Sequence, residues 1–323
     1  MNSKKHSTTC IVLVTYNRRD LLLNALNSIF ELSTSVSAIT IINNNSSDDT
    51  ENILNQLGII KLSDIETSKA YLKSKNSFTL KDGASVSIEY IRTNENLGSA
   101  GGFKLGLESS FKNNYDWYWL MDDDITVTPD SLEKLIEYGS FCKCIQPSKN
   151  YFHGGNFKWN GLIDESYGRY HKKEEDFSEN KSFTLVNYGC FEGMFVHHSI
   201  VKAVGFPNEK YFFICDDTDF GFRISKVTNI VYIKDQLLIK HIDKTGDLPS
   251  ILGDYLLSRN QTNFFVSISR KKVLTGFNRF TWTIKNSLHR LLKLRLYKNS
   301  IWIIKGYFDG IFGIFGREKD LIK

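Results

Sequence analysis

Residues 117–124 read Trp-Tyr-Trp-Leu-Met-Asp-Asp-Asp, an apolar and aromatic run that ends in consecutive carboxylates. A run of this length predicts a buried strand, and helical patterns before and after it predict an open α/β sheet. Ligands of such sheets bind beyond the carboxyl ends of the strands, which is where these carboxylates would lie.

The carboxylates Asp122, Asp123 and Asp124 repel one another unless a cation neutralises them. In an extended segment Asp122 and Asp124 point to one face and Asp123 to the other. This arrangement suits a hard divalent metal that carries a phosphorylated ligand. An acidic turn, or an N-cap for a helix near Pro129, is the alternative interpretation.

Composition indicates a folded chain. The 323 residues suffice for one large α/β domain with an appendage, and 41% hydrophobic content argues against disorder. Five cysteines without C-x-x-C spacing predict reduced thiols and no zinc site. The apolar run at residues 10–14 is too short for a signal peptide. Charged residues interrupt the most apolar late segment, so no membrane span is predicted.

The net charge of +5 is unevenly distributed. From Arg259 onward 14 Lys+Arg stand against 3 Asp+Glu, a net +11, which leaves 27 against 33, a net −6, for residues 1–258. Aromatic and aliphatic residues are interspersed among the basic residues from Arg259 onward. We therefore expect one α/β domain at 1–258 and a helical, basic, amphipathic extension at 259–323 that lies on an anionic membrane surface.

Two other interpretations of the extension stay open, namely helices that pack back on the preceding domain and a homo-oligomer interface. RNA binding is disfavoured because no nucleic-acid-binding motif accompanies the charge.

Two predicted strands, residues 9–16 and 38–42, each lead through a polar turn into a helix. Side chains in such turns either cap the helix or contact a ligand, and amides there could face a nucleobase. The polar residues of these two turns that we single out are Thr15, Asn17, Arg18, Asn43 and Asn44.

Residues 58–85 are polar and weakly periodic, which predicts an insertion of unspecified structure. A third strand at 86–92 follows, and then a turn that contains Asn96 and Gly98 before a helix at 101–111. Glycines in this turn let the backbone approach a ligand, and the helix N-terminus favours an anion. The spacing is not G-x-G-x-x-G, so no dinucleotide fingerprint is present.

A second acidic cluster contains Asp216, Asp217 and Asp219, after a stretch at 186–196 that predicts a pair of strands. A carboxylate among apolar residues and like charges has a raised pKa and can act as a general base. Asp219 and Arg223 have the i, i+4 spacing of an ion pair. His241 follows the last apolar strand and could complete a metal site.

In this order the motifs resemble the family 2 inverting glycosyltransferases of the GT-A fold, from about residue 9 to about residue 260. The glycine-rich loop, the triple Asp and the Asp pair before Asp219 look most like galactofuranosyltransferases, and rhamnosyltransferases share much of the pattern. There are two departures. Asn43 or Asn44 stands where such proteins often carry an Asp that accepts from uracil N3–H, and Asp216 stands where Glu is common.

The resemblance implies a nucleotide-sugar donor whose diphosphate is held by Mn²⁺ or Mg²⁺ on Asp124 and His241, with Asp122 supporting the ribose or the metal. It implies that Asp217, beside Asp216, deprotonates the acceptor hydroxyl for a single displacement that inverts the anomeric carbon. The donor-binding residues that it implies are Thr15, Asn17, Arg18, Asn43, Asn44, Arg92, Asn96, Gly98, Asp122 and Asp123.

The expected function is metal-dependent transfer of galactofuranose from UDP-galactofuranose to a lipid-linked glycan acceptor, for a bacterial surface polysaccharide. The expected location is cytoplasmic, peripheral on the inner face of the cell membrane. Rhamnosyl transfer from dTDP-rhamnose is the alternative within this enzyme class. A non-catalytic nucleotide- or carbohydrate-binding module is the alternative from another class.

Overall fold

The computed structural model describes residues 7–64, 66–68, 70–157, 161–172, 181–242, 249–316 and 321. The strands of this part of the chain are β1 (Thr9–Thr15), β2 (Ala38–Asn43), β3 (Glu66–Thr67), β4 (Tyr71–Thr79), β5 (Ser85–Thr93), β6 (Trp117–Asp122), β7 (Ile125–Val127), β8 (Cys144–Tyr151), β9 (Asn156–Phe157), β10 (Gly161–Asp164), β11 (Arg169–Lys172), β12 (Phe183–Val186), β13 (Phe195–His197) and β14 (Ile230–Lys240).

The α-helices of the same residues are α1 (Arg19–Phe30), α2 (Thr50–Gln56), α3 (Gly98–Phe111), α4 (Ser131–Gly139), α5 (His198–Val204), α6 (Asp216–Ser225), α7 (Ile251–Ile268), α8 (Lys272–Leu288) and α9 (Tyr297–Phe312). Two 3-10 turns, η1 (Leu62–Asp64) and η2 (Glu209–Tyr211), and one π-helical turn, η3 (His289–Lys293), complete the regular structure of these residues.

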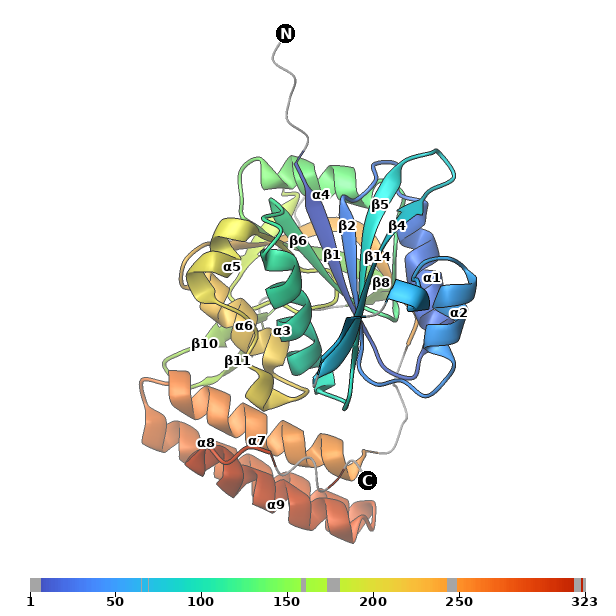
Figure 1. Ribbon diagram of the computed structural model, residues 1–323. Coiled ribbons are helices and arrows are strands. Elements are labelled where there is room, and N and C mark those ends of the chain that lie inside the picture. The colour runs from blue at the N-terminus through green and yellow to red at the C-terminus, as the bar shows by residue number, and fades with distance from the viewer. Residues whose placement is uncertain are drawn as a thin grey trace.

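Twelve of the described strands form one mixed sheet in the order β12-β14-β8-β13-β6-β1-β2-β5-β4-β3, with β7 paired to β14 and β9 to β8 (Figure 1). Alternate residues of β1 point to opposite faces of this sheet. Ile11 and Leu13 join the apolar cluster that includes residues of α1 and α4, whereas Val12 and Val14 join the cluster with α3 and α6. The sheet is therefore covered by helices on both faces.

The centre of the sheet is parallel, because β1 pairs in parallel with both β2 and β6, and β2 pairs in parallel with β5. Thr15 lies opposite Asn43, and Val14 lies opposite Asp122. The carboxyl ends of these strands therefore meet at one edge of the sheet, where open α/β sheets bind ligands. The mixed α/β fold predicted from sequence is confirmed.

The insertion predicted at 58–85 contributes to the sheet. β4 runs antiparallel to β5 through nine residue pairs, from Tyr71 opposite Thr93 to Thr79 opposite Ser85. Most residues of β4 are exposed or half-buried. An edge strand of this kind carries little hydrophobic alternation, which is why its sequence does not identify it.

The strand pair predicted at 186–196 is wrong. β12 ends at Val186 and β13 begins at Phe195, and the two strands pair with different neighbours. The residues between them form a loop in which Gly193 has φ of 96°, a conformation that interrupts a strand.

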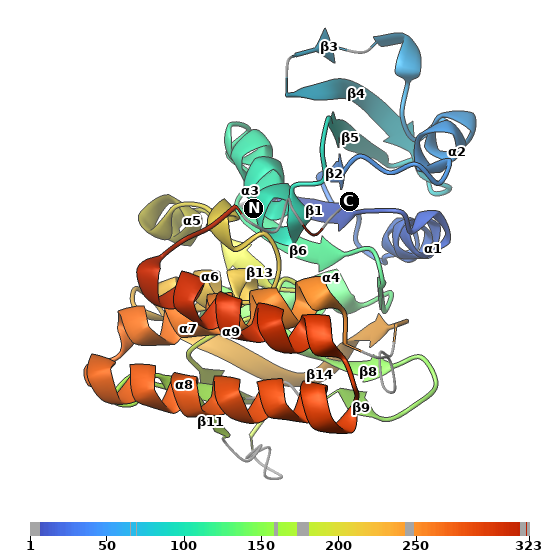
Figure 2. The same cartoon turned by 90° about the horizontal axis from the view of Figure 1, so that it is seen from below.

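The domain boundary predicted at 258 falls inside α7, which begins at Ile251. The change in net charge predicts the boundary at 258, whereas the helix begins after Ser250. The Ser250 side chain caps the helix, since it accepts from the Gly253 N–H at 2.9 Å. α7, α8 and α9 form one layer beneath the sheet domain (Figures 1 and 2). Among the described residues, no helix combines the length and apolarity needed to cross a bilayer.

Candidate active site

A cavity of about 680 Å³ opens at the carboxyl edge of the parallel strands. This volume is within the ordinary range for small-molecule sites. The cavity brings together ten of the residues singled out from the sequence, namely Thr15, Arg18, Asn44, Asn96, Gly98, Asp122, Asp123, Asp124, Asp216 and Asp217. The first turns after β1, β2, β5 and β6 thus converge with the start of α6.

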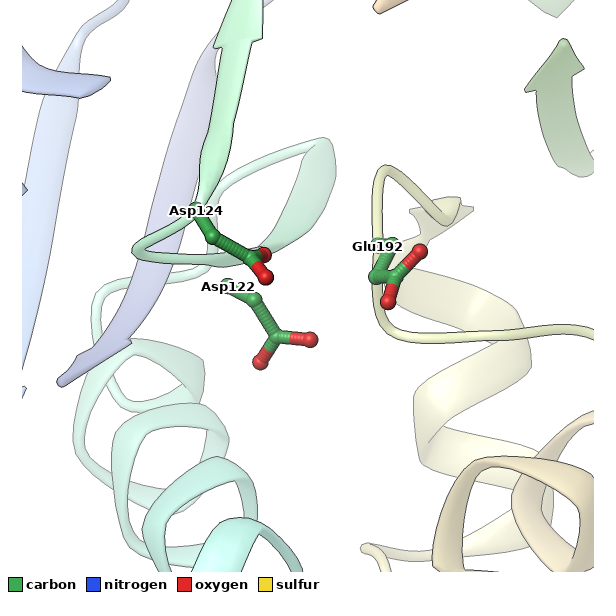
Figure 3. Close-up of side chains that lie close together, drawn as sticks. All are labelled: Asp122, Asp124 and Glu192. Atoms are coloured by element: carbon green, nitrogen blue, oxygen red, sulfur yellow. The ribbon is translucent and has the colours of Figure 1, made fainter. Parts of the chain in front are cut away.

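Three carboxylates gather in this cavity. One oxygen each of Asp122, Asp124 and Glu192 lies within 4.8 Å of the other two. Asp122 is the last residue of β6, Asp124 lies in the turn that follows it, and Glu192 lies in the loop that precedes β13 (Figure 3). Burial, together with the nearby carboxylates of Asp124 and Glu192, raises the pKa of Asp122 well above its usual value.

Two lysines partly neutralise these acids. Lys240 Nζ lies 2.6 Å from Glu192 Oε1 and 3.3 Å from Asp124 Oδ2, and Lys149, which is 2% exposed, pairs with the other Glu192 oxygen. Although burial disfavours a charged carboxylate, Lys149 and Lys240 hold the pKa of Glu192 well below its usual range. Glu192 therefore favours its ionised form near neutral pH.

Asp123 points away from the other two aspartates and has a different role. Its carboxylate accepts from Thr15 Oγ1 at 2.8 Å and from Arg18 Nη1 at 3.0 Å. The alternation that the sequence predicts for the triple Asp is thus present. Asp123 fastens the turn after β6 to the turn after β1, while its neighbours face the cavity.

The residues present fit a divalent cation. Asp124 Oδ1 is buried and has no hydrogen-bond partner in the part of the chain that the structure describes. Mg²⁺ and Mn²⁺ prefer carboxylate oxygens, and Asp122 and Glu192 supply further oxygens within reach. This unpaired oxygen would be costly to bury unless a cation or a donor meets it.

Asp216 and Asp217 open α6 beside the three carboxylates. Asp216 Oδ2 accepts from Ser99 Oγ at 2.5 Å. Among the described contacts, the Asp217 carboxylate accepts only from the N–H and hydroxyl of Thr218. Burial and the neighbouring Asp216 carboxylate raise the pKa of Asp217 to about 7. Of this pair Asp217 therefore has the proton affinity that a general base needs near neutral pH.

Asp219, the third carboxylate of this cluster, is occupied elsewhere. It pairs with Arg223 at 2.9 Å, four residues later on α6. Arg223 also donates to the carbonyl oxygens of Val204 and Phe206. The predicted ion pair is present, and it ties α6 to the segment after α5.

The loop that precedes Asp216 and Asp217 contains residues in an energetically unfavourable backbone conformation. Phe212, Ile214 and Cys215 have φ values of 65°, 68° and 67°, a region that bulky and β-branched residues avoid. The carbonyl of Phe212 accepts from the Ala100 N–H at 3.0 Å. It also lies so close to Gly98 that any Cβ there would overlap it.

Helix α7 holds the same loop from the other side. The Asn260 Nδ2 group, which is fully buried, donates to the carbonyl oxygens of Tyr211, Phe213 and Ile214 at 3.0, 2.8 and 2.8 Å. Arg259 donates to the Tyr211 carbonyl at 3.0 Å. The C-terminal layer therefore stabilises the strained segment that positions the predicted base.

Two residues of the β2 turn differ in their bonding. Asn43 donates to the Tyr90 hydroxyl at 2.9 Å and accepts from the Ser46 N–H at 2.7 Å, so both ends of its amide are used in the fold. Asn44 lines the cavity and donates to the Gly98 carbonyl, while its Oδ1 has no partner among the described residues. Asn44 is thus the member of the pair with a free acceptor for a ligand.

Asn17, Arg92 and His241 do not line the cavity. Arg92 pairs with Glu51 at 3.1 Å, and the Asn17 side chain accepts from the Ser47 N–H. His241 Nε2 lies 2.9 Å from Thr126 Oγ1, while the His241 N–H donates to the Asp124 carbonyl. The ligand-binding roles implied for these three residues stay predictions.

Glu192, Lys149 and Lys240 are the residues that the sequence reasoning missed. The available signal was a single acid inside the apolar stretch 190–196, and a lysine within each of two strands. Buried charges of this kind require partners. Glu192 lies 43 residues from Lys149 and 48 residues from Lys240 along the chain, so the sequence does not show that these charges meet.

Comparison with known proteins identifies the family of this chain. The family model for glycosyl transferase family 2 matches residues 10–200, which include β2 to β13, the triple Asp and Glu192. Two solved structures of S. aureus TarS 1-349, one of them in complex with UDP-GlcNAc, superpose with TM-scores of 0.58 and 0.59. Each covers 94% of this chain and 81% of the other, at 10% and 11% identity, so the likeness shows the GT-A type of fold.

Sequence relatives match shorter segments. A galactofuranosyltransferase of Mycolicibacterium smegmatis is 25% identical over 115 residues, which are 36% of this chain and 29% of that protein. A galactofuranosyltransferase of Mycobacterium tuberculosis is 43% identical over 42 residues, or 13% of this chain and 14% of the relative. The match thus spans less than a third of either relative. From the family match and the fold we conclude that the chain is a glycosyltransferase and belongs to glycosyl transferase family 2.

Proposed function

We propose that this enzyme transfers galactofuranose from UDP-galactofuranose to a lipid-linked glycan acceptor, with a divalent cation and inversion at the anomeric carbon. The observation that carries the proposal is one cavity that holds two groups of acids. In the first, Asp122, Asp124 and Glu192 lie close together and the pKa of Glu192 is lowered. In the second, the pKa of Asp217 is raised to about 7. One group suits a cation and the other suits a base.

The donor nucleotide has matching partners in the cavity. Asn44 Oδ1, free among the described residues, would accept from the N3–H of uracil. Arg18 and Lys240 add positive charge near the position of a diphosphate. When bound, Mn²⁺ or Mg²⁺ would supply the charge that stabilises the departing diphosphate. TarS, which shares the fold, has been solved with UDP-GlcNAc and with UDP, which favours a uridine nucleotide here.

Asp217 would accept the proton of the acceptor hydroxyl as that oxygen attacks the anomeric carbon. Asp216, fixed by the Ser99 hydroxyl, keeps the neighbouring charge that raises the pKa of Asp217. Similarity to the mycobacterial galactofuranosyltransferases supports galactofuranose as the sugar. We propose the inner face of the cell membrane as the location, since a lipid-linked acceptor would be reached there.

Thermal unfolding of the full chain with UDP, dTDP and GDP, each with and without Mn²⁺, tests the donor site. A ligand at about 100 times its dissociation constant adds roughly 2.7 kcal/mol of stability. We expect UDP with Mn²⁺ to stabilise most, and turnover of UDP-galactofuranose to follow. A preference for dTDP would instead favour rhamnosyl transfer, and no response to any nucleotide would overturn the proposal.

Two matched variants identify the cation site. Asp124→Asn should remove the Mn²⁺-dependent part of the stabilisation, because it removes charge where a carboxylate oxygen is unpaired. Asp20→Asn changes an exposed carboxylate on α1 and should leave the response intact. Equal responses from both variants would contradict the assignment of the cation to the acidic cavity.

A further inference from the structure

Helix α8 has its polar side inward and its apolar side outward. The buried residues of α8 are Thr275, Gly276, Arg279, Thr283 and Ser287. Most of its large apolar residues are exposed instead, with Val273 90% and Phe277 62% exposed, while Trp282 and Ile284 are half-buried. Helices on water-soluble proteins have the opposite arrangement, because apolar side chains are stabilised by leaving water.

Helix α9 repeats the inversion. Its buried positions include Asn299, Ser300 and Asp309, whereas Ile301 and Phe312 are 65% and 71% exposed. Phe277, Phe280 and Leu288 of α8 and Ile301, Phe308 and Phe312 of α9 are hereafter called the outer face. On each helix these residues recur at spacings of three, four, seven or eight, so they form one stripe.

Helices α7 and α9 pack through close backbone contact, and Ile303 is the large apolar residue that α9 buries. Gly306 and Gly310, four residues apart on α9, lie against the backbone of α7, and a Cβ at Gly306 would approach the Tyr255 carbonyl to 2.5 Å. Buried hydroxyl groups line the same contact, including Ser258 and Thr262 of α7. Small residues and polar groups at helix contacts, with apolar residues outside, are typical of helices surrounded by lipid.

The charge available around the outer face is positive. Residues 272–312 contain eight Lys and Arg and a single acid, Asp309. Arg279 is buried and Arg290 pairs with Asp254. The other six basic residues are exposed or half-buried: Lys272, Lys285, Lys293, Arg295, Lys298 and Lys305. Asp309 is buried and accepts from the Tyr255 hydroxyl, so it offers no exposed negative charge. A second copy docked through this face would place like charges together, whereas anionic lipid headgroups would meet opposite charge.

We infer that α8 and α9 are embedded in the surface of an anionic bilayer, with the outer face among the acyl chains and the flanking lysines and arginines at the phosphates. No helix of the described residues is suited to span a membrane, so the layer lies in the interface. This goes beyond the transfer reaction, because it assigns a partner to a surface away from the cavity. It does not depend on the identity of the donor sugar.

Cosedimentation of the full chain with phosphatidylglycerol–phosphatidylcholine vesicles tests the inference. We expect partition into these vesicles, weaker partition into pure phosphatidylcholine, and binding that survives in part at high salt because apolar contacts are not screened. The paired substitutions Phe277→Ser and Ile301→Ser should lower partition at least about tenfold, since each removes apolar area from the bilayer.

The control variant carries Leu57→Ser and Phe141→Ser, which alter exposed apolar residues of the sheet domain and should leave partition unchanged. Equal partition of both variants, or complete loss of binding at high salt, would overturn embedding. A dimer that only the outer-face substitutions dissociate, without a change in vesicle binding, would assign the face to a second copy. Stabilisation by UDP and Mn²⁺, measured in the same variants, reports separately on the donor site.

Discussion

The cavity and the C-terminal layer both bury polar groups, but for different reasons. In the cavity charged groups are enclosed beside an apolar core, and Asp124 Oδ1 is left without a described partner. In the layer the polar residues turn inward because the outward residues are apolar, as with Phe277. The cavity suits a charged ligand that binds from water, whereas we propose that the helical layer contacts lipid.

The two regions meet at one loop. Asn260 of α7 bonds the carbonyls of residues 211, 213 and 214, and Asp217 follows three residues after the last of these. The surface that we assign to the membrane is therefore mechanically connected to the predicted base. The predictions below test each region and then their connection.

Asp217→Asn should produce the largest effect. Loss of a general base lowers kcat by about 10²–10⁴-fold, while binding of UDP should persist because the phosphate-facing groups remain. Above pH 7 the variant should also be more stable, because burial of a carboxylate with a raised pKa lowers the free energy of unfolding as the pH rises. Steady-state kinetics and urea unfolding measure both effects, and unchanged kcat would remove Asp217 as the base.

Glu192→Gln should be the most destabilising change in the cavity. It removes the carboxylate that pairs with Lys149, which is 2% exposed, and breaking a buried pair costs about 3–5 kcal/mol. Adding Lys149→Met should recover part of the loss, because it removes the buried charge that Glu192 neutralises. Urea unfolding of the single and double variants gives the coupling, and a loss below about 1 kcal/mol would show that the pair is not important for stability.

The next largest expected effect is a fall of kcat/KM at acidic pH. Asp217 accepts a proton only when ionised, and its pKa is raised to about 7, so the rate should fall about tenfold for each unit below that value. Above it the rate should level off. A profile that stays flat between about pH 5 and about pH 8 would contradict a base of raised pKa.

Asn260→Ala connects the two regions and should give the smallest effect. It removes hydrogen bonds to three carbonyls, of which that of Tyr211 is buried, and we expect kcat to fall severalfold and stability to fall by about 1–3 kcal/mol. Asn263→Ala is the matched control on α7, since Asn263 donates only to Gly310 of α9 among the described contacts. A similar loss of stability without a change in kcat is expected there. Equal kcat values in the two variants would mean that α7 does not position the base.

Much of the cavity could be predicted from sequence because its residues follow strands with clear patterns. The buried run of β6 ends at the triple Asp, and β1 ends at Thr15, so parallel pairing alone places them together. Glu192 could not be placed, since it lies in a loop whose glycines resemble a strand bend. The side-chain contacts of His241 with Thr126 and of Arg92 with Glu51 could not be predicted either, because these partners are distant in sequence.

The helical layer could be predicted only as far as its helices and its charge. The sequence of α8 shows an apolar side and a polar side, but it does not say which side packs against the protein. That choice depends on tertiary contacts, such as the approach of Gly306 to the Tyr255 carbonyl. The usual assumption that apolar residues face inward would have given the wrong orientation.

Crystals of the full chain grown with UDP and Mn²⁺ would give the most direct test of the central claim, through the anomalous scattering of manganese. We predict a single strong peak within coordinating distance of the Asp124 and Asp122 carboxylates, with the uracil beside Asn44. A manganese peak outside the cavity, or UDP bound with no manganese near Asp124, would contradict the account.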